Sequence, residues 1–177
     1  MMQKITMSFK KKVWKLKEEF KTSNRSKNTN QVETIEVIIK KNGHIGRGES
    51  TPYIRYGEDI TNSLHELKQI KPYIENGLTK KLLQIKMKPS SARCAVDCAM
   101  WDLEAKEKNK KIWQLLKIKN KPSPLITTES YGIRPLTRLK NDIIRDNYPP
   151  IIKLKANGKN VLDIVKTVNK VSKSSKL

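Results

Sequence analysis

The spacing of hydrophobic residues changes twice along this 177-residue chain, and each change predicts a different kind of secondary structure. Near the N-terminus, hydrophobic and polar residues alternate, as at Ile5, Met7 and Phe9, which is typical of a half-buried strand. From about Glu58, hydrophobic residues recur every three or four positions, which is typical of helices with one buried face. After a proline-containing break at 120–124, strand and helix patterns alternate.

The N-terminal third predicts a small antiparallel meander. The expected strands span residues 5–17, 32–40 and 44–49. A polar loop over 21–31 joins the first two strands, and Asn42-Gly43 favours a type I′ hairpin turn between the second and the third. Gly46 and Gly48 in the third strand would let another backbone approach closely.

The remaining residues predict a helical segment and then a mixed one. The expected helices of the middle segment span residues 58–74, 79–86, 90–106 and 112–116. Beyond the break we expect a strand, a helix, a strand and a helix, over residues 125–130, 136–145, 151–155 and 160–171. Such alternation indicates parallel βα units. The predicted organisation is an α+β domain over 1–121, followed by two βα units over 122–177 that cannot close a barrel by themselves.

The strong positive charge is a weak indication of nucleic-acid binding. The chain has 38 Lys and Arg against 17 Asp and Glu, for a net charge of +21, and 31 of the 38 are lysines. Arginine, not lysine, makes the bidentate contacts typical of base and phosphate recognition. Lysine, asparagine and isoleucine share A/T-rich codons, so codon usage explains the excess, and we expect no specific nucleic-acid partner.

The hydrophobic runs and the cysteine count predict where the chain resides. No apolar run approaches the roughly 20 residues of a membrane span, so we expect no membrane association. Two cysteines, Cys94 and Cys98, cannot build a disulfide framework, which favours a reducing, cytoplasmic compartment. Their spacing on one helix would also suit a metal, but we favour packing in the core. Asp97 and Asp102 on the same helix are interpreted as structural hydrogen-bonding groups.

Three strings, in this order, carry a resemblance to a known family. They are GESTPYIRYGE at Gly48–Glu58, ARCAVDCAMWDL at Ala92–Leu103 and IKLK at Ile152–Lys155. Together they resemble dipeptide epimerases of the enolase superfamily, whose N-terminal domain is of the mandelate racemase/muconate lactonizing enzyme type. The resemblance extends over nearly the whole chain from Thr6. It implies a capping domain, made of a three-stranded antiparallel meander and a helical bundle, and the first two βα units of an incomplete TIM barrel.

The resemblance also implies a chemistry. In that family Mg²⁺ binds the carboxylate of a dipeptide such as L-Ala-D/L-Glu, and two lysines on opposite faces exchange its α-proton. The Lys-x-Lys strand falls on Lys153 and Lys155, which makes Lys155 the acid/base and Lys153 its assistant. Residues i and i+2 of a strand share a face, so both ammonium groups would point the same way. Like charges so close disfavour protonation of both amines at once. A lysine that acts as a base must be unprotonated, so this proximity favours the role.

Substrate-binding positions follow by the same resemblance. The loop after the first strand would place Lys27 where the family has an arginine that reaches the acidic side chain of the substrate. Arginine and lysine are not equivalent at a carboxylate clamp, so this position departs from the family. Tyr53 and Ile54 would belong to a second loop over the site. Ser130 falls on the first barrel strand, where the family often has threonine.

The family's metal ligands lie on its third, fourth and fifth barrel strands, and its opposing lysine lies on the sixth. We therefore expect no metal ligand in this chain and no activity from the chain alone, as in a truncated epimerase. Two alternatives remain open: a split enzyme completed by a second chain, and a basic binding module that reuses the capping domain. Members of the family are usually homo-oligomeric.

Overall fold

The computed structural model describes residues 4–22, 29–158 and 160–177. Backbone contacts divide the chain into two compact units. The first unit comprises Met1–Trp14 and Val32–Pro122, and the second comprises Lys15–Gln31 and Ser123–Leu177. The first two strands run through both units, because their shared hairpin end belongs to the second. The domain division at 121/122 stays a prediction.

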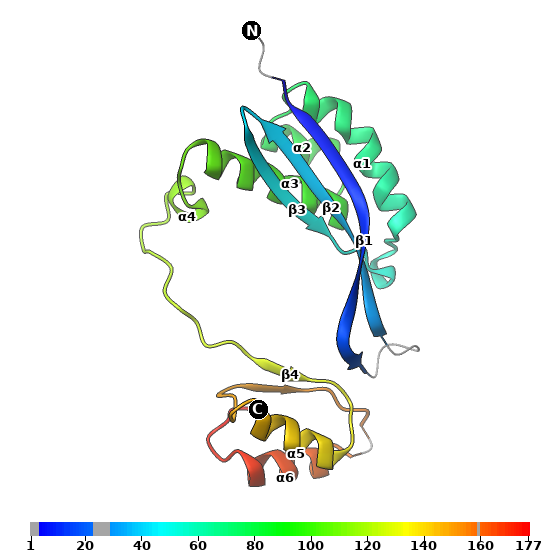
Figure 1. Ribbon diagram of the computed structural model, residues 1–177, viewed down its shortest axis with the longest axis vertical. Coiled ribbons are helices and arrows are strands. Elements are labelled where there is room, and N and C mark those ends of the chain that lie inside the picture. The colour runs from blue at the N-terminus through cyan, green and yellow to red at the C-terminus, as the bar shows by residue number, and fades with distance from the viewer. Residues whose placement is uncertain (1–3, 23–28, 159) are drawn as a thin grey trace. The chain divides into compact units, whose positions relative to one another are not determined.

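A three-stranded sheet forms the centre of the first unit, in the order β1-β2-β3. Its strands are β1 (Thr6–Phe20), β2 (Thr29–Lys41) and β3 (His44–Ser50), and neighbouring strands run antiparallel (Figure 1). Asn42 and Gly43 have φ angles of 51° and 77°, as a type I′ turn requires. The second strand begins earlier than the hydrophobic pattern predicts, because pairing with β1 also recruits polar residues.

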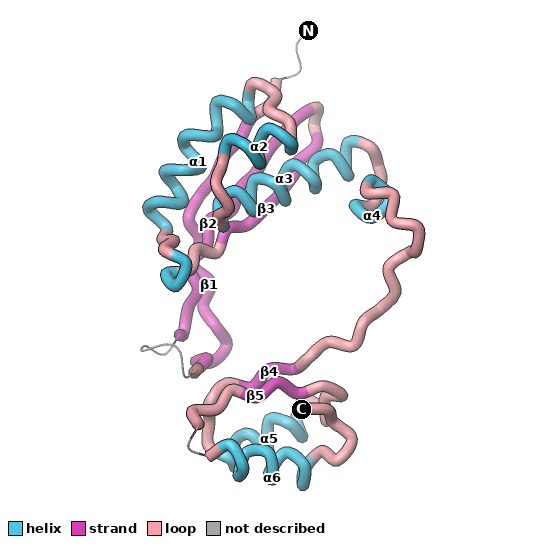
Figure 2. The backbone as a smooth tube through the Cα atoms, turned by 180° about the vertical axis from the view of Figure 1, so that it is seen from behind, coloured by secondary structure: helices cyan, strands magenta, loops and turns pink. Residues whose placement is uncertain are grey.

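Helices cover one face of this sheet, as both views show (Figures 1 and 2). They are α1 (Ile60–Glu75), α2 (Lys80–Lys86) and α3 (Ser91–Glu107). The short α4 (Ile112–Leu115) follows α3, and a 3-10 turn, η1, at Ile54–Tyr56 precedes α1. The side chains of Asp59, Thr79 and Ser90 each accept a backbone N–H of the first turn of α1, α2 and α3, respectively. These caps fix where α1, α2 and α3 begin.

The core of the first unit forms where α3 packs against the sheet. Its buried side chains come from both layers and include Met7, Ile35, Val37, Ile39, Leu67, Ala92, Ala95, Val96 and Ala99. A Cβ atom on Gly46 would lie 2.0 Å from the carbonyl oxygen of Ala99, and one on Gly48 would lie 1.9 Å from that of Ala95. The two glycines therefore bring the backbones of β3 and α3 together, which confirms the predicted close approach.

The same helix also covers part of the free edge of β3. The carboxylate of Asp102 accepts the backbone N–H of Arg47 at 2.8 Å, and Lys106 Nζ donates to the carbonyl oxygen of Ile45 at 2.8 Å. Asp102 and Lys106 also pair with each other at 2.6 Å. The structural interpretation of Asp102 is thereby confirmed, and an ion pair on α3 satisfies two edge groups that would otherwise face solvent.

Two βα units make up most of the second unit, as predicted. They are β4 (Glu129–Tyr131), α5 (Leu136–Arg145), β5 (Ile152–Leu154) and α6 (Val161–Val171), with β4 and β5 paired in parallel. Lys176 forms an isolated parallel bridge with Ile151, on the far side of β5 from β4. The buried core consists of Tyr131, Leu139, Ile143, Ile152, Ile164 and Val168.

The first strand of this unit lies later than predicted. We expected it over 125–130, but only Glu129–Tyr131 is paired. Leu125 and Ile126 are 89% and 68% exposed, so their hydrophobic character does not reflect burial in the described residues. The three residues Ile152–Leu154 of β5 fix the register, and they pair with residues 129–131 alone. No helix in the described part of the chain has the length and apolar character needed to cross a membrane.

Candidate functional site

The Lys-x-Lys strand presents its two lysines on one face of the β4–β5 sheet. Ile152 is 2% exposed and belongs to the core with α5 and α6, and Leu154 packs against that core. Strand alternation therefore turns Lys153 and Lys155 to the opposite face. Lys153 is exposed and Lys155 is half-buried. The backbone N–H of Lys155 donates to the carbonyl oxygen of Tyr131 at 3.0 Å, which holds the residue beside β4.

Ser130 joins the lysines on this face. It is the register partner of Lys153 across the two parallel strands and is itself exposed, whereas its neighbour Tyr131 is buried toward the helices. Among the residues that the structure describes, neither lysine makes an ion pair through its ammonium group. We call Ser130, Lys153 and Lys155 the lysine face. It offers two amines that no carboxylate of residues 4–22, 29–158 and 160–177 neutralises.

The other predicted substrate-binding residues are not part of the lysine face. Tyr53 and Ile54 belong to the first unit, where Ile54 is 84% exposed in η1. The Tyr53 ring meets the Tyr56 ring edge-on, with centroids 5.6 Å apart, and the Tyr53 backbone N–H donates to Glu58 at 3.4 Å. Lys27 lies outside the described residues.

The donor atoms present do not make a magnesium site. Mg²⁺ prefers oxygen ligands in octahedral geometry, commonly one or two carboxylates completed by water and substrate. Within residues 4–22, 29–158 and 160–177 there is no group of three or more histidine, cysteine, aspartate or glutamate side chains that could hold a metal ion. The lysine face carries amines and one hydroxyl. The Mg²⁺ that the family implies therefore has no binding group among these residues.

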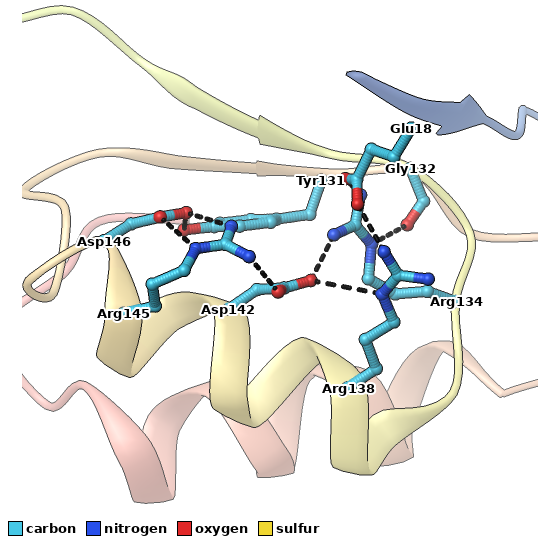
Figure 3. A network of polar contacts seen from close by, with 8 residues as sticks. All are labelled: Glu18, Tyr131, Gly132, Arg134, Arg138, Asp142, Arg145 and Asp146. Atoms are coloured by element: carbon cyan, nitrogen blue, oxygen red, sulfur yellow. Dashed lines mark hydrogen bonds and ion pairs between the residues drawn. The ribbon is translucent and has the colours of Figure 1, made fainter. Parts of the chain in front are cut away.

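An ion network in the second unit was missed by the sequence analysis (Figure 3). Its centre is Asp142 on α5, which is only 5% exposed. Its carboxylate pairs with Arg134, with Arg138 Nε at 3.7 Å and with Arg145 Nη1 at 2.8 Å. Glu18, near the end of β1, pairs with Arg134 at 3.1 Å and also with Arg138. One buried carboxylate thus forms ion pairs with three arginines.

This network fastens the hairpin end of β1 to the turn between β4 and α5. The backbone N–H of Ile133 donates to the carbonyl oxygen of Lys21 at 2.9 Å. A Cβ atom on Gly132 would lie 2.9 Å from the same oxygen, so a glycine is needed for this approach. Arg134 Nε donates to the carbonyl oxygen of Gly132 at 3.1 Å. The turn after β4 is therefore fixed by a backbone hydrogen bond to the end of β1 and by the side chain of Arg134. Arg134, Arg138 and Asp142 follow one another at intervals of four residues, and this spacing could have predicted the ion pair between Arg138 and Asp142 on a helix.

A second polar contact connects β4 to the end of α5. The Tyr131 hydroxyl donates to Asp146 Oδ2 at 3.0 Å, and Arg145 Nε lies 2.9 Å from Asp146 Oδ1. The hydrogen bond from Arg145 holds the pKa of Asp146 below its ordinary value, against the opposing effect of burial. Burial is the main reason that the pKa of Tyr131 is raised, so its hydroxyl stays a donor at neutral pH.

We expect the second unit to lose stability as the pH falls below about 3.8, the ordinary pKa of an aspartate. The folded state protonates Asp146 less readily than the unfolded chain, so its contribution is complete above that pH and is lost as the pH falls through the lower folded pKa. Urea unfolding followed by the NMR signals of the Tyr131 ring, at about pH 5 and about pH 3, measures the loss. Arg145→Gln should reduce the difference, and an unchanged difference would contradict the assignment.

The cysteine interpretation was wrong. Cys94 and Cys98 are both exposed on α3. Ala95 and Ala99, one position further along, pack against the sheet instead, and the helical period turns the thiols away from the core. Asp97, by contrast, accepts a hydrogen bond from Gln84 at 3.4 Å, as a structural role predicts.

Comparison with known proteins places this geometry in a family. The chain is 31% identical over 136 residues to the L-Ala-D/L-Glu epimerase of Escherichia coli K12, a match that covers 77% of this chain and 41% of that protein. A structure of an enolase family member from Agrobacterium tumefaciens with homology to dipeptide epimerases, bound to sodium and L-Ala-L-Glu, superposes with a TM-score of 0.88. It is 24% identical, and the match covers 97% of this chain and 52% of the other.

A second solved structure has the same fold. The dipeptide epimerase of Enterococcus faecalis, complexed with Mg and the dipeptide L-Leu-L-Tyr, superposes with a TM-score of 0.82 at 22% identity, covering 98% of this chain and 52% of that one. The chain thus spans about two fifths of the length of its curated relative. Residues 4–117 match the N-terminal domain of the mandelate racemase / muconate lactonizing enzyme family, and the chain belongs to that family.

Proposed function

We propose that the chain is the capping domain and the first two barrel units of a dipeptide epimerase, in which Lys155 exchanges the α-proton of the substrate. The observation that carries this proposal is the lysine face, where Lys153 and Lys155 leave their ammonium groups without a carboxylate partner among the described residues. The similarity to an L-Ala-D/L-Glu epimerase and to dipeptide-bound structures supports the substrate class.

Each residue of the lysine face has a distinct part in this proposal. Lys155, as a neutral amine, accepts the proton from the α-carbon on one face of the substrate. The neighbouring ammonium of Lys153 stabilises the negative charge that develops on the substrate. Ser130 offers a hydroxyl to the bound dipeptide. Lys27, Tyr53 and Ile54 are proposed to contact the substrate side chains. A cytoplasmic location would supply such dipeptides.

The proposed reaction needs more than this chain displays. Inversion at a carbon requires a proton donor on the face opposite Lys155, and a single sheet face presents its amines on one side only. The described residues also hold no metal-binding group to stabilise the carbanion. We therefore propose that the lysine face works only together with further barrel strands, supplied by a continuing chain or by a second polypeptide.

The first test uses the chain alone. We expect no exchange of the α-proton when the purified chain is incubated in D₂O with L-Ala-D-Glu and Mg²⁺, followed by ¹H NMR. Exchange at a catalytic rate would contradict the proposed dependence on further strands.

The second test asks about Lys155 directly. The remaining barrel segment of the Escherichia coli relative, fused after Leu177, should restore exchange, and Lys155→Met should reduce that exchange by about 10²–10⁴-fold, the usual contribution of a general base. Lys166→Met, an exposed lysine on α6, is the matched control and should leave the rate unchanged. A Lys155→Met fusion that is folded by circular dichroism and exchanges as fast as its parent would exclude the proposed role.

A further inference from the structure

The two exposed cysteines of α3 form a pair on a rigid helix. Cys94 and Cys98 are both exposed and lie four residues apart on α3, a spacing that places their side chains on the same face of the helix. The opposite side of α3 packs against Gly46 and Gly48 at backbone contact distance, so the helix cannot shift without disrupting the core. The pair is therefore held in place by a well-packed element, which is what a preorganised ligand site needs.

The charged residues beside the pair are already engaged. Arg93 Nη1 donates to the carbonyl oxygens of Met87 at 3.2 Å and Gln84 at 3.5 Å. Asp97 accepts from Gln84, as described above. No third histidine, cysteine, aspartate or glutamate in the described ranges completes a metal-binding group with the thiols. The site therefore offers two sulfur ligands and no more.

Two sulfur ligands select a particular class of ion. Zn²⁺ requires four ligands in a structural site, so two thiolates do not satisfy it. Soft thiolates favour Cu⁺, and monovalent d¹⁰ ions such as Cu⁺ and Ag⁺ accept linear coordination by two sulfurs. If the bonds are about as long as a zinc–sulfur bond, about 2.3 Å, two of them in a line span about 4.6 Å. Side chains at i and i+4 have Cβ atoms roughly 5–6 Å apart, which suits that span.

We propose that Cys94 and Cys98 form a two-coordinate site for a soft monovalent cation, Cu⁺ in the cell. Binding replaces the two S–H bonds with two metal–sulfur bonds and releases two protons to solvent, and no electron is transferred. The site is independent of the lysine face and of the proposed epimerase chemistry.

Titration of the full reduced chain with Ag⁺, a probe that does not change oxidation state, tests the proposal. We expect one Ag⁺ per chain by native mass spectrometry, bound about 100-fold more tightly than by Cys94→Ser or Cys98→Ser, because the second thiol adds an intramolecular contact. Anaerobic titration with Cu⁺ should rank the parent chain above both serine variants in affinity, as with Ag⁺. Unchanged melting temperatures show that the serine variants remain folded.

A matched control keeps two thiols but separates them. Combining Cys98→Ser with Lys68→Cys, at an exposed position of α1, leaves two cysteines on different helices. This variant should bind Ag⁺ no more tightly than the single serine variants. Equal affinity in the parent chain and in either single variant would overturn the proposal, as would silver that bridges two chains in the mass spectrum.

Discussion

Replacing Gly48 with alanine should destabilise the first unit by about 3 kcal/mol or more, the upper range for overpacking of a close-packed interior. The new methyl group would lie 1.9 Å from the carbonyl oxygen of Ala95, and that atom belongs to the helix backbone. A side chain can rotate out of such a contact, but a carbonyl in the middle of α3 can move only if the helix moves. The whole interface between α3 and β3 must therefore open.

Urea unfolding followed by tryptophan fluorescence measures this loss, because Trp14, Trp101 and Trp113 all belong to the first unit. Gly77→Ala is the matched control. Gly77 has a φ of 85° and nothing within 4 Å of its added Cβ, so this change costs only conformational strain, about 1–2 kcal/mol. Equal losses in the two variants would show that the contact between β3 and α3 is looser than described.

Replacing Asp142 with leucine should destabilise the second unit by about 3–5 kcal/mol, as expected when a buried ion pair loses one partner. The side chain of Arg134 is only 9% exposed, and among the described residues the partly exposed Glu18 is the charged partner that its guanidinium keeps without Asp142. Arg138 and Arg145 are 55% and 61% exposed and can turn to water. The loss therefore arises mainly from Arg134.

The combination of Arg134→Met with Asp142→Leu separates this cause from simple packing. Removing both buried charges should recover much of the lost stability, because paired apolar groups of similar volume are often neutral replacements. Asp163→Asn, an exposed aspartate in the first turn of α6, should cost less than about 1 kcal/mol. Urea unfolding followed by NMR signals of the second-unit core measures the stability of all three variants. A double variant as unstable as Asp142→Leu alone would contradict the argument.

Local sequence patterns predicted most elements because each element buries one face. The helix over 136–145 has the bounds that its spacing predicted, and the turn at Asn42-Gly43 follows from residues that tolerate a positive φ. The strand over 125–130 was misplaced, because apolar residues indicate burial and Leu125 remains exposed. Pairing, not hydrophobicity, decided where β4 lies.

The candidate site was predictable to the extent that it lies within one strand. The shared face of Lys153 and Lys155 follows from alternation alone. That Ser130 faces Lys153 follows from the register between two strands, which no local pattern contains. The pairs that Asp142 makes within α5 have a local spacing, but Glu18 joins the network from 120 residues away in the chain, which no local pattern contains. Such contacts exist only once the fold has formed.

The ion pair that covers the edge of β3 also bears on self-association. Fibrils can grow when the unpaired backbone groups of an edge strand bond to a strand of another molecule. Asp102 and Lys106 occupy two such groups on the edge strand β3. The opposite edge strand, β1, carries lysines at residues 10–12, of which Lys11 pairs with Glu33 and Lys12 with Glu36 on β2. Charged side chains on an edge strand oppose the addition of another strand, so replacing these lysines with uncharged residues should make the protein more prone to aggregate.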